Sequence, residues 1–261
     1  MPSLEPFYLR DRERYTATAS TEGPWDPALQ HGGPVAALLA SRIEAAAVSA
    51  ETRVAHFALE FFAPAPRAPL DVETSVVRPG KKIALLRATG LHAGRAVVSA
   101  SAWVLATREG RSPLIHLLDA APPPMPQKAI ETYFESVPHF GYGDALEWRF
   151  TEGGFNRLGP AAVWARLRVP IVEGEAISPL ARVLAMVDSA NGISAELDPT
   201  EYLFVPVNLT VALARPPATE WTGMRALTAM ASDGVGVTRA HLYDERGAIG
   251  EALQTLYVEK R

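Results

Sequence analysis

Two hydrophobic periods alternate along the first half of this chain. The Ala- and Leu-rich run VAALLASRIEAAAV at 35–48 has the spacing of a helix, and Gly33-Pro34 precedes it as a helix-start signal. Segments with the alternation and β-branched content of strands follow at 54–77, 83–93 and 95–108, with turns at 78–82 and at Gly94. The first half is therefore predicted to be one helix followed by antiparallel strands.

The second half repeats this order. Ser178-Pro179 opens the apolar run LARVLAMVDSANG, and alternating segments follow at 203–232, 235–249 and 250–261. The segments 57–73 and 206–223 align by eye. One helix followed by a meander of strands, written twice, indicates a duplicated α+β unit in which a helix packs on an antiparallel sheet.

A proline-rich stretch separates the two halves. Residues 120–127 carry three consecutive prolines and a fourth two residues later, and this composition allows neither a helix nor a central strand to continue. We therefore predict an N-terminal unit at 1–118, a linker at 119–135 and a C-terminal unit at 136–261.

Composition narrows the class of protein. With 48% hydrophobic and 21% charged residues the chain can bury a core, which excludes intrinsic disorder. A net charge of −4 argues against a nucleic-acid partner, which would need a basic face. The absence of cysteine excludes disulfides, zinc–thiolate sites and a cysteine nucleophile, and favours a reducing cytosol.

Membrane insertion is not predicted. The opening residues MPSLEPFYLRDRERY lack the apolar core of a signal peptide. The most apolar stretch, at 34–48, contains Arg42 and Glu44 and is too short to span a bilayer. A cytoplasmic location is the expectation.

Familiar catalytic and cofactor motifs are missing. The chain has no G-x-S-x-G, and Gly141-Tyr142-Gly143 lacks the third glycine of a dinucleotide fingerprint. The six histidines show no metal-ligand spacing. Neither a metal nor a cofactor is predicted.

The second helix carries a carboxylate on its apolar face. Helical steps from Leu180 place Asp188 and Asn191 in line with the leucines and valines that should face the sheet. A buried carboxylate costs several kcal/mol unless it is paired, and the C-terminal end of a helix dipole disfavours it further. Both effects raise the pKa of Asp188, as suits a general acid or base; the alternative is a structural group that pins a loop where Asn191-Gly192 ends the helix.

A glutamine in the last strand is a second polar residue on an apolar face. Alternation places Gln254 on the same face as Ala252, Leu256 and Val258. If that face is buried, the amide needs partners for its oxygen and its NH2 group; otherwise the side chain is simply solvated.

The entry to the first helix, Gln30-His31-Gly32-Gly33-Pro34, is the third feature. Two glycines leave backbone N–H groups uncovered at the positive end of a helix, where an anion or oxyanion could bind. An ordinary tight turn into the helix is the alternative.

These features together resemble a known family. The helix at 179–192 with its Asp188, the strand with Thr228 and the closing GAIGEALQTLYVEKR resemble the second half of the acyl-CoA thioesterase II family. The opening GPWDPALQHGGPVAALLASRIE is similar to the first half of its thioesterase-like relatives. The resemblance implies a double-hotdog fold, in which two units, each a long helix wrapped by an antiparallel sheet, join edge to edge into one continuous sheet.

The resemblance also implies a site and a reaction. Members of the family hydrolyse acyl-CoA with an Asp, a Thr or Ser and a Gln that hold a water, and these fall on Asp188, Thr228 (with Ser232 as a nearby substitute) and Gln254. Gly32 and Gly33 would polarise the thioester carbonyl from across the pseudo-dimer. CoA is then part of the substrate and not a cofactor. The chain is expected to form a homodimer and to function in lipid metabolism.

Four residues are expected to contact the substrate, and one position departs from the family pattern. His31, Gly32, Gly33 and Asn191 are expected to contact the acyl-CoA. Asp188 is followed by Ser189, where the best-matching family pattern has a histidine.

Two other functions remain open. A hotdog protein can bind acyl-CoA or an acyl chain without catalysis. An enoyl-CoA hydratase-type hotdog pairs its Asp or Glu with a nearby His, and this sequence has no histidine after Asp188 until His241. The hydrolase is the leading prediction.

Overall fold

The computed structural model describes residues 4–47, 51–112, 121–130, 132–137 and 139–261, and in these residues a single sheet holds all the strands. The helices are α1 (Gly32–Ala47), α2 (Gly141–Asp144), α3 (Pro179–Val187) and α4 (Ala190–Ile193), with a 3-10 turn at Ala19–Thr21. The strands of the first half are β1 (Tyr8–Asp11), β2 (Arg14–Ala17), β3 (Thr52–Phe61), β4 (Leu70–Arg78), β5 (Ile83–His92) and β6 (Arg95–Ala106). Those of the second half are β7 (Leu146–Glu152), β8 (Ala161–Leu167), β9 (Tyr202–Pro206), β10 (Asn208–Leu213), β11 (Thr222–Met230), β12 (Val235–Asp244) and β13 (Gly247–Lys260).

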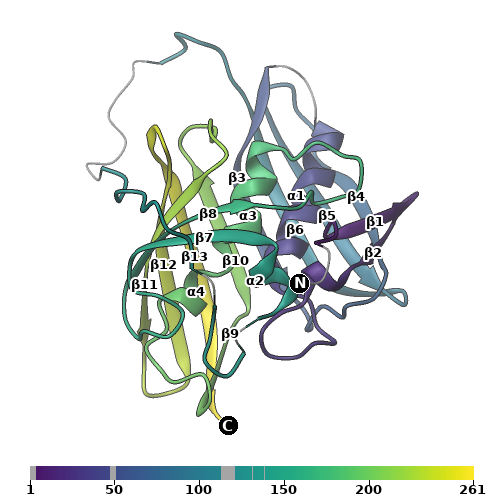
Figure 1. Ribbon diagram of the computed structural model, residues 1–261. Coiled ribbons are helices and arrows are strands. Elements are labelled where there is room, and N and C mark those ends of the chain that lie inside the picture. Colours follow the sequence, from purple (N-terminus) through teal and green to yellow (C-terminus); the bar gives the residue numbers. More distant parts are fainter. Residues whose placement is uncertain (1–3, 48–50, 113–120, 131, 138) are drawn as a thin grey trace.

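The two halves of the sheet meet edge to edge. Their strands run in the order β1-β2-β4-β5-β6-β3 and then β10-β13-β12-β11-β8-β7, with β9 paired to β13. Strand β3 pairs with β10 antiparallel, and Leu59 lies opposite Leu209 in the middle of that ladder. The two halves lie side by side in Figure 1, coloured purple to blue and teal to yellow.

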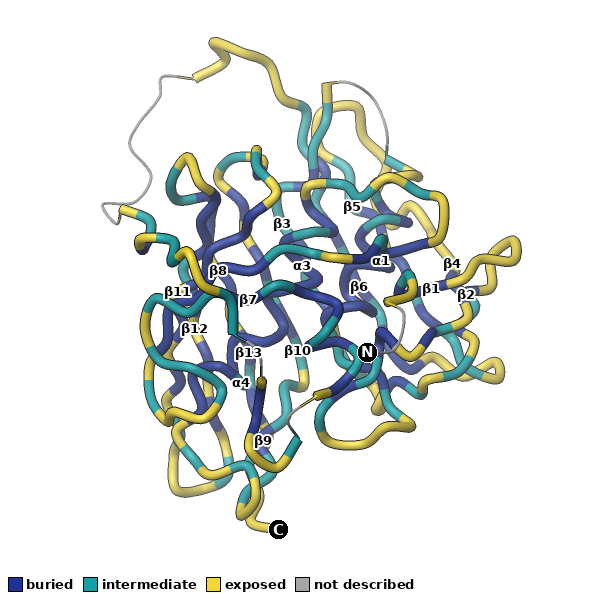
Figure 2. The backbone as a smooth tube through the Cα atoms, viewed as in Figure 1, coloured by how far each residue is buried: buried dark blue, intermediate teal, exposed yellow. Residues whose placement is uncertain are grey.

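Helices α1 and α3 pack against each other on the inner face of the sheet (Figure 1). Helix α1 packs on β3 to β6 and α3 packs on β8 and β11, so both helices are buried along most of their length (Figure 2). Every residue of α3 except Pro179 and Arg182 is buried, as expected for a helix enclosed between a sheet and another helix. The predicted double-hotdog architecture with one continuous sheet is confirmed.

Two predicted strand runs are divided, and that at 203–232 forms β9, β10 and β11. The run expected at 54–77 forms β3 and β4, with an irregular segment between them at 62–69. Pro64, Pro66 and Pro69 lie in this segment, and prolines cannot donate to a ladder. Because this segment lies outside the named strands, its side chains can line a cavity.

The division into units at 1–118, 119–135 and 136–261 stays a prediction. Residues 113–120, at its first boundary, and residue 131 lie outside the described part of the chain, as does Val48 at the predicted end of the first helix. The N-terminal segment contacts the second half, because Phe7 N–H donates to Pro170 and Tyr8 N–H donates to Ile171. Among the helices described, none is long and apolar enough to cross a membrane.

Candidate active site

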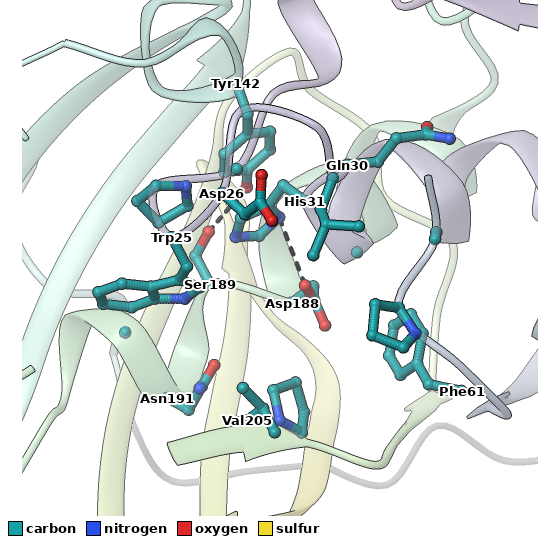
Figure 3. A pocket seen from close by; sticks show the side chains of 18 of the residues that line it. Trp25, Asp26, Gln30, His31, Phe61, Tyr142, Asp188, Ser189, Asn191 and Val205 are labelled. Atoms are coloured by element: carbon teal, nitrogen blue, oxygen red, sulfur yellow. Dashed lines mark hydrogen bonds and ion pairs between the residues drawn. The ribbon is translucent and has the colours of Figure 1, made fainter. Parts of the chain in front are cut away.

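A cavity of about 490 Å³ opens where the two halves of the chain meet. It lies between the loop before α1, the segment after β3, the end of α3 with α4, and strand β9 (Figure 3). Its walls are largely apolar, and the apolar side chains include Trp25, Leu29, Phe61, Phe134, Phe140 and Leu203. Its few polar side chains include Asp188 and His31, which come from different halves.

Asp188 is buried at the wall of this cavity. Its side chain is 4% exposed, the backbone N–H of Gly32 donates to its carboxylate, and Gln254 Nε2 donates to Oδ1 at 3.3 Å. Burial raises the pKa of Asp188 from 3.8 to about 7, because desolvation disfavours the charged form more than these two hydrogen bonds favour it. The carboxyl can therefore gain and lose a proton near neutral pH.

Gln254 stabilises the break between α3 and α4, which lies at Asp188. Its Oε1 accepts the N–H of Asn191 at 3.2 Å, and its Nε2 also donates to the carbonyl of Asp188 at 3.2 Å. In a continuous helix that N–H would bond to Val187 and that carbonyl to the N–H of Gly192. The predicted stop at Asn191-Gly192 is therefore wrong: α3 ends at Val187, and these two residues belong to α4.

The two glycines before Pro34 allow a close approach between α1 and the end of α3. A Cβ on Gly32 would lie 2.5 Å from Asp188 Oδ2, and one on Gly33 would lie 2.3 Å from the carbonyl oxygen of Ala185. The Gly33 N–H donates to His31 Nδ1 at 3.0 Å, while that of Gly32 is taken by Asp188. The backbone donors expected for the thioester carbonyl are thus already engaged.

His31 lies beside Asp188, with its Nδ1 3.4 Å from Asp188 Oδ2 (Figure 3). Burial lowers the pKa of His31 to about 3, so the ring is neutral. Because Nδ1 accepts the Gly33 N–H, the ring proton is on Nε2. The Nδ1 lone pair that accepts the Gly33 N–H therefore also faces Asp188 Oδ2.

Tyr142 and Ser189 support His31 and were not predicted. The rings of Tyr142 and His31 stack with centroids 3.7 Å apart and 7° between their planes. The Tyr142 hydroxyl donates to the carbonyl of Ala185 at 2.8 Å and lies 2.7 Å from Ser189 Oγ. No local pattern marks Tyr142, because its partners lie in distant segments of the chain.

Thr228 lies apart from the other two predicted catalytic residues. Its hydroxyl is 2.8 Å from Ser194 Oγ and 2.8 Å from Thr238 Oγ1. Thr228 lies opposite Thr238, and Thr238 lies opposite Gln254 on the next strand, so Thr228 is two strands away from Gln254. Thr228 and Gln254 do not line the cavity. The substitute Ser232 is exposed. The structure joins Asp188 to Gln254 and does not join Thr228 to either.

Three of the four predicted substrate-contacting residues line the cavity. These are His31, Gly32 and Asn191, whereas Gly33 is buried outside it. The Asn191 amide donates to the carbonyl of Phe204 at 3.2 Å, which ties α4 to β9. Within the described ranges, no three side chains of the metal-binding types are grouped as a metal site requires.

Comparison with models of protein families finds a match in each half of the chain. The model of the acyl-CoA thioesterase N-terminal domain matches residues 21–105, and that of the C-terminal domain matches residues 116–258. The C-terminal match alone spans more than half of the chain. The chain belongs to the acyl-CoA thioesterase family. No curated protein sequence matches the chain.

Solved structures share the fold at low identity. A provisionally named thioesterase from Novosphingobium aromaticivorans is 22% identical over 97% of this chain and 98% of its own, with a TM-score of 0.71. A hot dog fold protein from Alicyclobacillus acidocaldarius is 18% identical over 96% and 94%, with a TM-score of 0.71. The acyl-CoA thioesterase II TesB2 from Mycobacterium marinum is 14% identical over 96% and 93%, with a TM-score of 0.64.

Proposed function

We propose that this protein hydrolyses acyl-CoA thioesters to the free acid and CoA, with Asp188 as the general base. The observation that carries the proposal is a buried carboxyl, with a pKa raised to about 7, at the wall of an apolar cavity. Such a cavity suits an apolar acyl group, and such a carboxyl suits proton transfer near neutral pH. Membership of the acyl-CoA thioesterase family supports the same reaction.

In the proposed reaction Asp188 takes a proton from a water molecule. The water oxygen forms a bond to the thioester carbonyl carbon, and the carbon–sulfur bond then breaks. The leaving thiolate of CoA takes the proton back from Asp188, so that the products are the acid and the free thiol. Gln254 positions the carboxylate by donating to Oδ1 and by holding the helix break.

His31 is the proposed donor to the thioester carbonyl oxygen. Its Nε2–H has no hydrogen-bond partner among the described residues, and the residue lines the cavity. Its neutrality keeps that proton in place, while stacking on Tyr142 fixes the plane of the ring. A fixed donor aimed at the developing oxyanion is the usual means of stabilising this transition state.

Thr228 is proposed to act at a distance from the water. Through Ser194 it anchors α4 to β11, and α4 follows directly on Asp188 and Ser189. This positioning role replaces the direct contact with water that the family resemblance implies for it.

A second candidate function is hydration or dehydration at the 2,3-bond of an acyl-CoA. The contact between His31 Nδ1 and Asp188 Oδ2 favours it, because that class pairs an acid with a nearby imidazole. The lack of a histidine soon after Asp188 argued against this class, but His31 reaches Asp188 from the other half of the chain. The apolar cavity serves either reaction.

One substrate panel distinguishes these functions. Saturated acyl-CoAs are assayed for release of free thiol, and the matching 2-enoyl-CoAs are followed by the absorbance of the conjugated double bond. We expect thiol release, lost in Asp188→Asn with substrate binding retained. Loss of the double bond without thiol would assign a hydratase, and binding without either change would assign a non-catalytic protein.

A further inference from the structure

Gly192 is a glycine that neither the backbone nor the packing of the protein requires. It lies in α4, and its φ is not in the left-handed region where glycine is favoured. A Cβ built on it meets no heavy atom within 4 Å. Glycine weakens a helix relative to alanine, so a residue with a side chain would be accommodated here and would favour the helix.

The other two glycines that line the cavity, Gly23 and Gly32, differ from it. A Cβ on Gly32 would collide with Asp188 and Phe61, and one on Gly23 would contact the backbone of His31. At both positions a side chain would meet the protein itself. Gly192 lines the cavity, and the open space in front of it is therefore available to a ligand.

The wall that carries Gly192 is anchored on both sides. The N–H of Asn191 is held by Gln254 and its side chain by the carbonyl of Phe204. On the other side, the Ser194 hydroxyl donates to Ala190 and contacts Thr228. A larger side chain at Gly192 would consequently narrow the cavity and not push α4 away.

We propose that Gly192 determines the acyl-chain specificity of this site, because the side chain it lacks leaves room for the far part of an apolar acyl group. This inference rests on the proposed thioester hydrolysis for its substrate class. Leu203 and Val205 on β9, which contacts α4, supply further apolar wall. The ligand in this space is the acyl group of the substrate and not its CoA portion.

The expected effect follows from the hydrophobic contribution of each methylene. A methylene displaced from the cavity loses about fourfold in kcat/KM, the factor that corresponds to ~0.8 kcal/mol. A leucine side chain displaces several methylenes, so Gly192→Leu should lose on the order of 100-fold for long chains and little for acetyl-CoA.

The test uses Gly192→Ala, Gly192→Val and Gly192→Leu with saturated acyl-CoAs from acetyl-CoA to palmitoyl-CoA. We expect the preferred chain to shorten stepwise with the size of the side chain, while the melting temperature stays equal or rises. Ala45→Leu is the matched control, because Ala45 is exposed on α1 and does not line the cavity. It should leave the chain-length profile unchanged.

Two outcomes would overturn the inference. An equal loss for every substrate, including acetyl-CoA, would place the reacting group or the CoA arm in front of Gly192. An unchanged profile in Gly192→Val, with the fold intact, would show that the acyl group lies elsewhere.

Calorimetric binding of saturated fatty acids separates this inference from the proposed hydrolysis. If the unmodified protein hydrolyses no thioester but Gly192→Val selectively loses binding of palmitate over that of hexanoate, only the proposed hydrolysis fails. If hydrolysis occurs and the chain-length profile does not move, only the role of Gly192 fails.

Discussion

Replacing Asp188 by Asn should stabilise the protein at alkaline pH while removing its activity. The carboxyl has a pKa of about 7 in the folded protein, against 3.8 for an ordinary aspartate. Between these two values the unfolded chain is ionised at this residue and the folded protein is not. Rising pH therefore favours unfolding across this window, and the loss of stability is complete above about pH 7.

The magnitude follows from the two pKa values. At about 1.4 kcal/mol for each pH unit, a rise from 3.8 to about 7 corresponds to a loss on the order of 4 kcal/mol. The amide introduced by Asp188→Asn does not ionise, so the variant escapes this loss. The amide oxygen can still accept from Gln254, but the N–H of Gly32 can lose its acceptor, at a cost of about 1–3 kcal/mol that does not vary with pH.

The assay is urea unfolding of both proteins at pH 4 and pH 8. The difference in unfolding free energy, Asn variant minus parent, should increase by about 4 kcal/mol between these pH values. Other titrating groups are common to both proteins and cancel. Thiol release at pH 8 should fall by about 10²–10⁴ in the variant, as expected when a general base is removed.

Two results would refute this reasoning. A difference in unfolding free energy that is the same at both pH values would mean that Asp188 has an ordinary pKa in the folded protein. A variant that is less stable at both pH values by a constant amount, with normal turnover, would mean that Asp188 has a structural role and is not the base.

Four further outcomes are expected. The kcat/KM for thiol release should rise with pH and level off above about 7, since only the ionised Asp188 accepts a proton from water; a flat profile from pH 5 to 9 would exclude it as the base. Gln254→Ala should lower kcat by about 10–100-fold, less than Asp188→Asn, because it only positions the carboxylate, and steady-state kinetics on both variants checks the order. Thr228→Val should lower the unfolding free energy by about 1–3 kcal/mol, with recovery in Thr228→Ser, whereas a loss of kcat as deep as that of Asp188→Asn at unchanged stability would assign Thr228 to the water. Light scattering at micromolar concentration should give twice the mass of one chain, and the mass of one chain would exclude the homodimer.

Local periodicity is sufficient to predict the repeated unit of this fold. Helical and strand periods reveal which face of each element is apolar, and the repeat of one helix and a meander predicts two similar units. The same patterns mark Asp188 and Gln254, because each is a polar residue on a face that must be buried. Burial of a single polar residue is a property of its own helix or strand, so it can be recognised without knowing the neighbours.

The assembly of the site depends on the tertiary structure. His31 reaches Asp188 only because α1 and α3 pack with the start of one against the end of the other, and Tyr142 joins them from a third segment. Alternation indicates that Thr228 faces inward, but only the strand order separates it from Gln254 by two strands. The helix likewise ends at Val187 because Gln254, more than sixty residues later, binds the N–H of Asn191 and the carbonyl of Asp188, which would otherwise continue the helical hydrogen bonds. Such contacts are absent from local periodicity because they depend on how distant elements pack, and that is decided by the sheet order and the helix-to-helix packing.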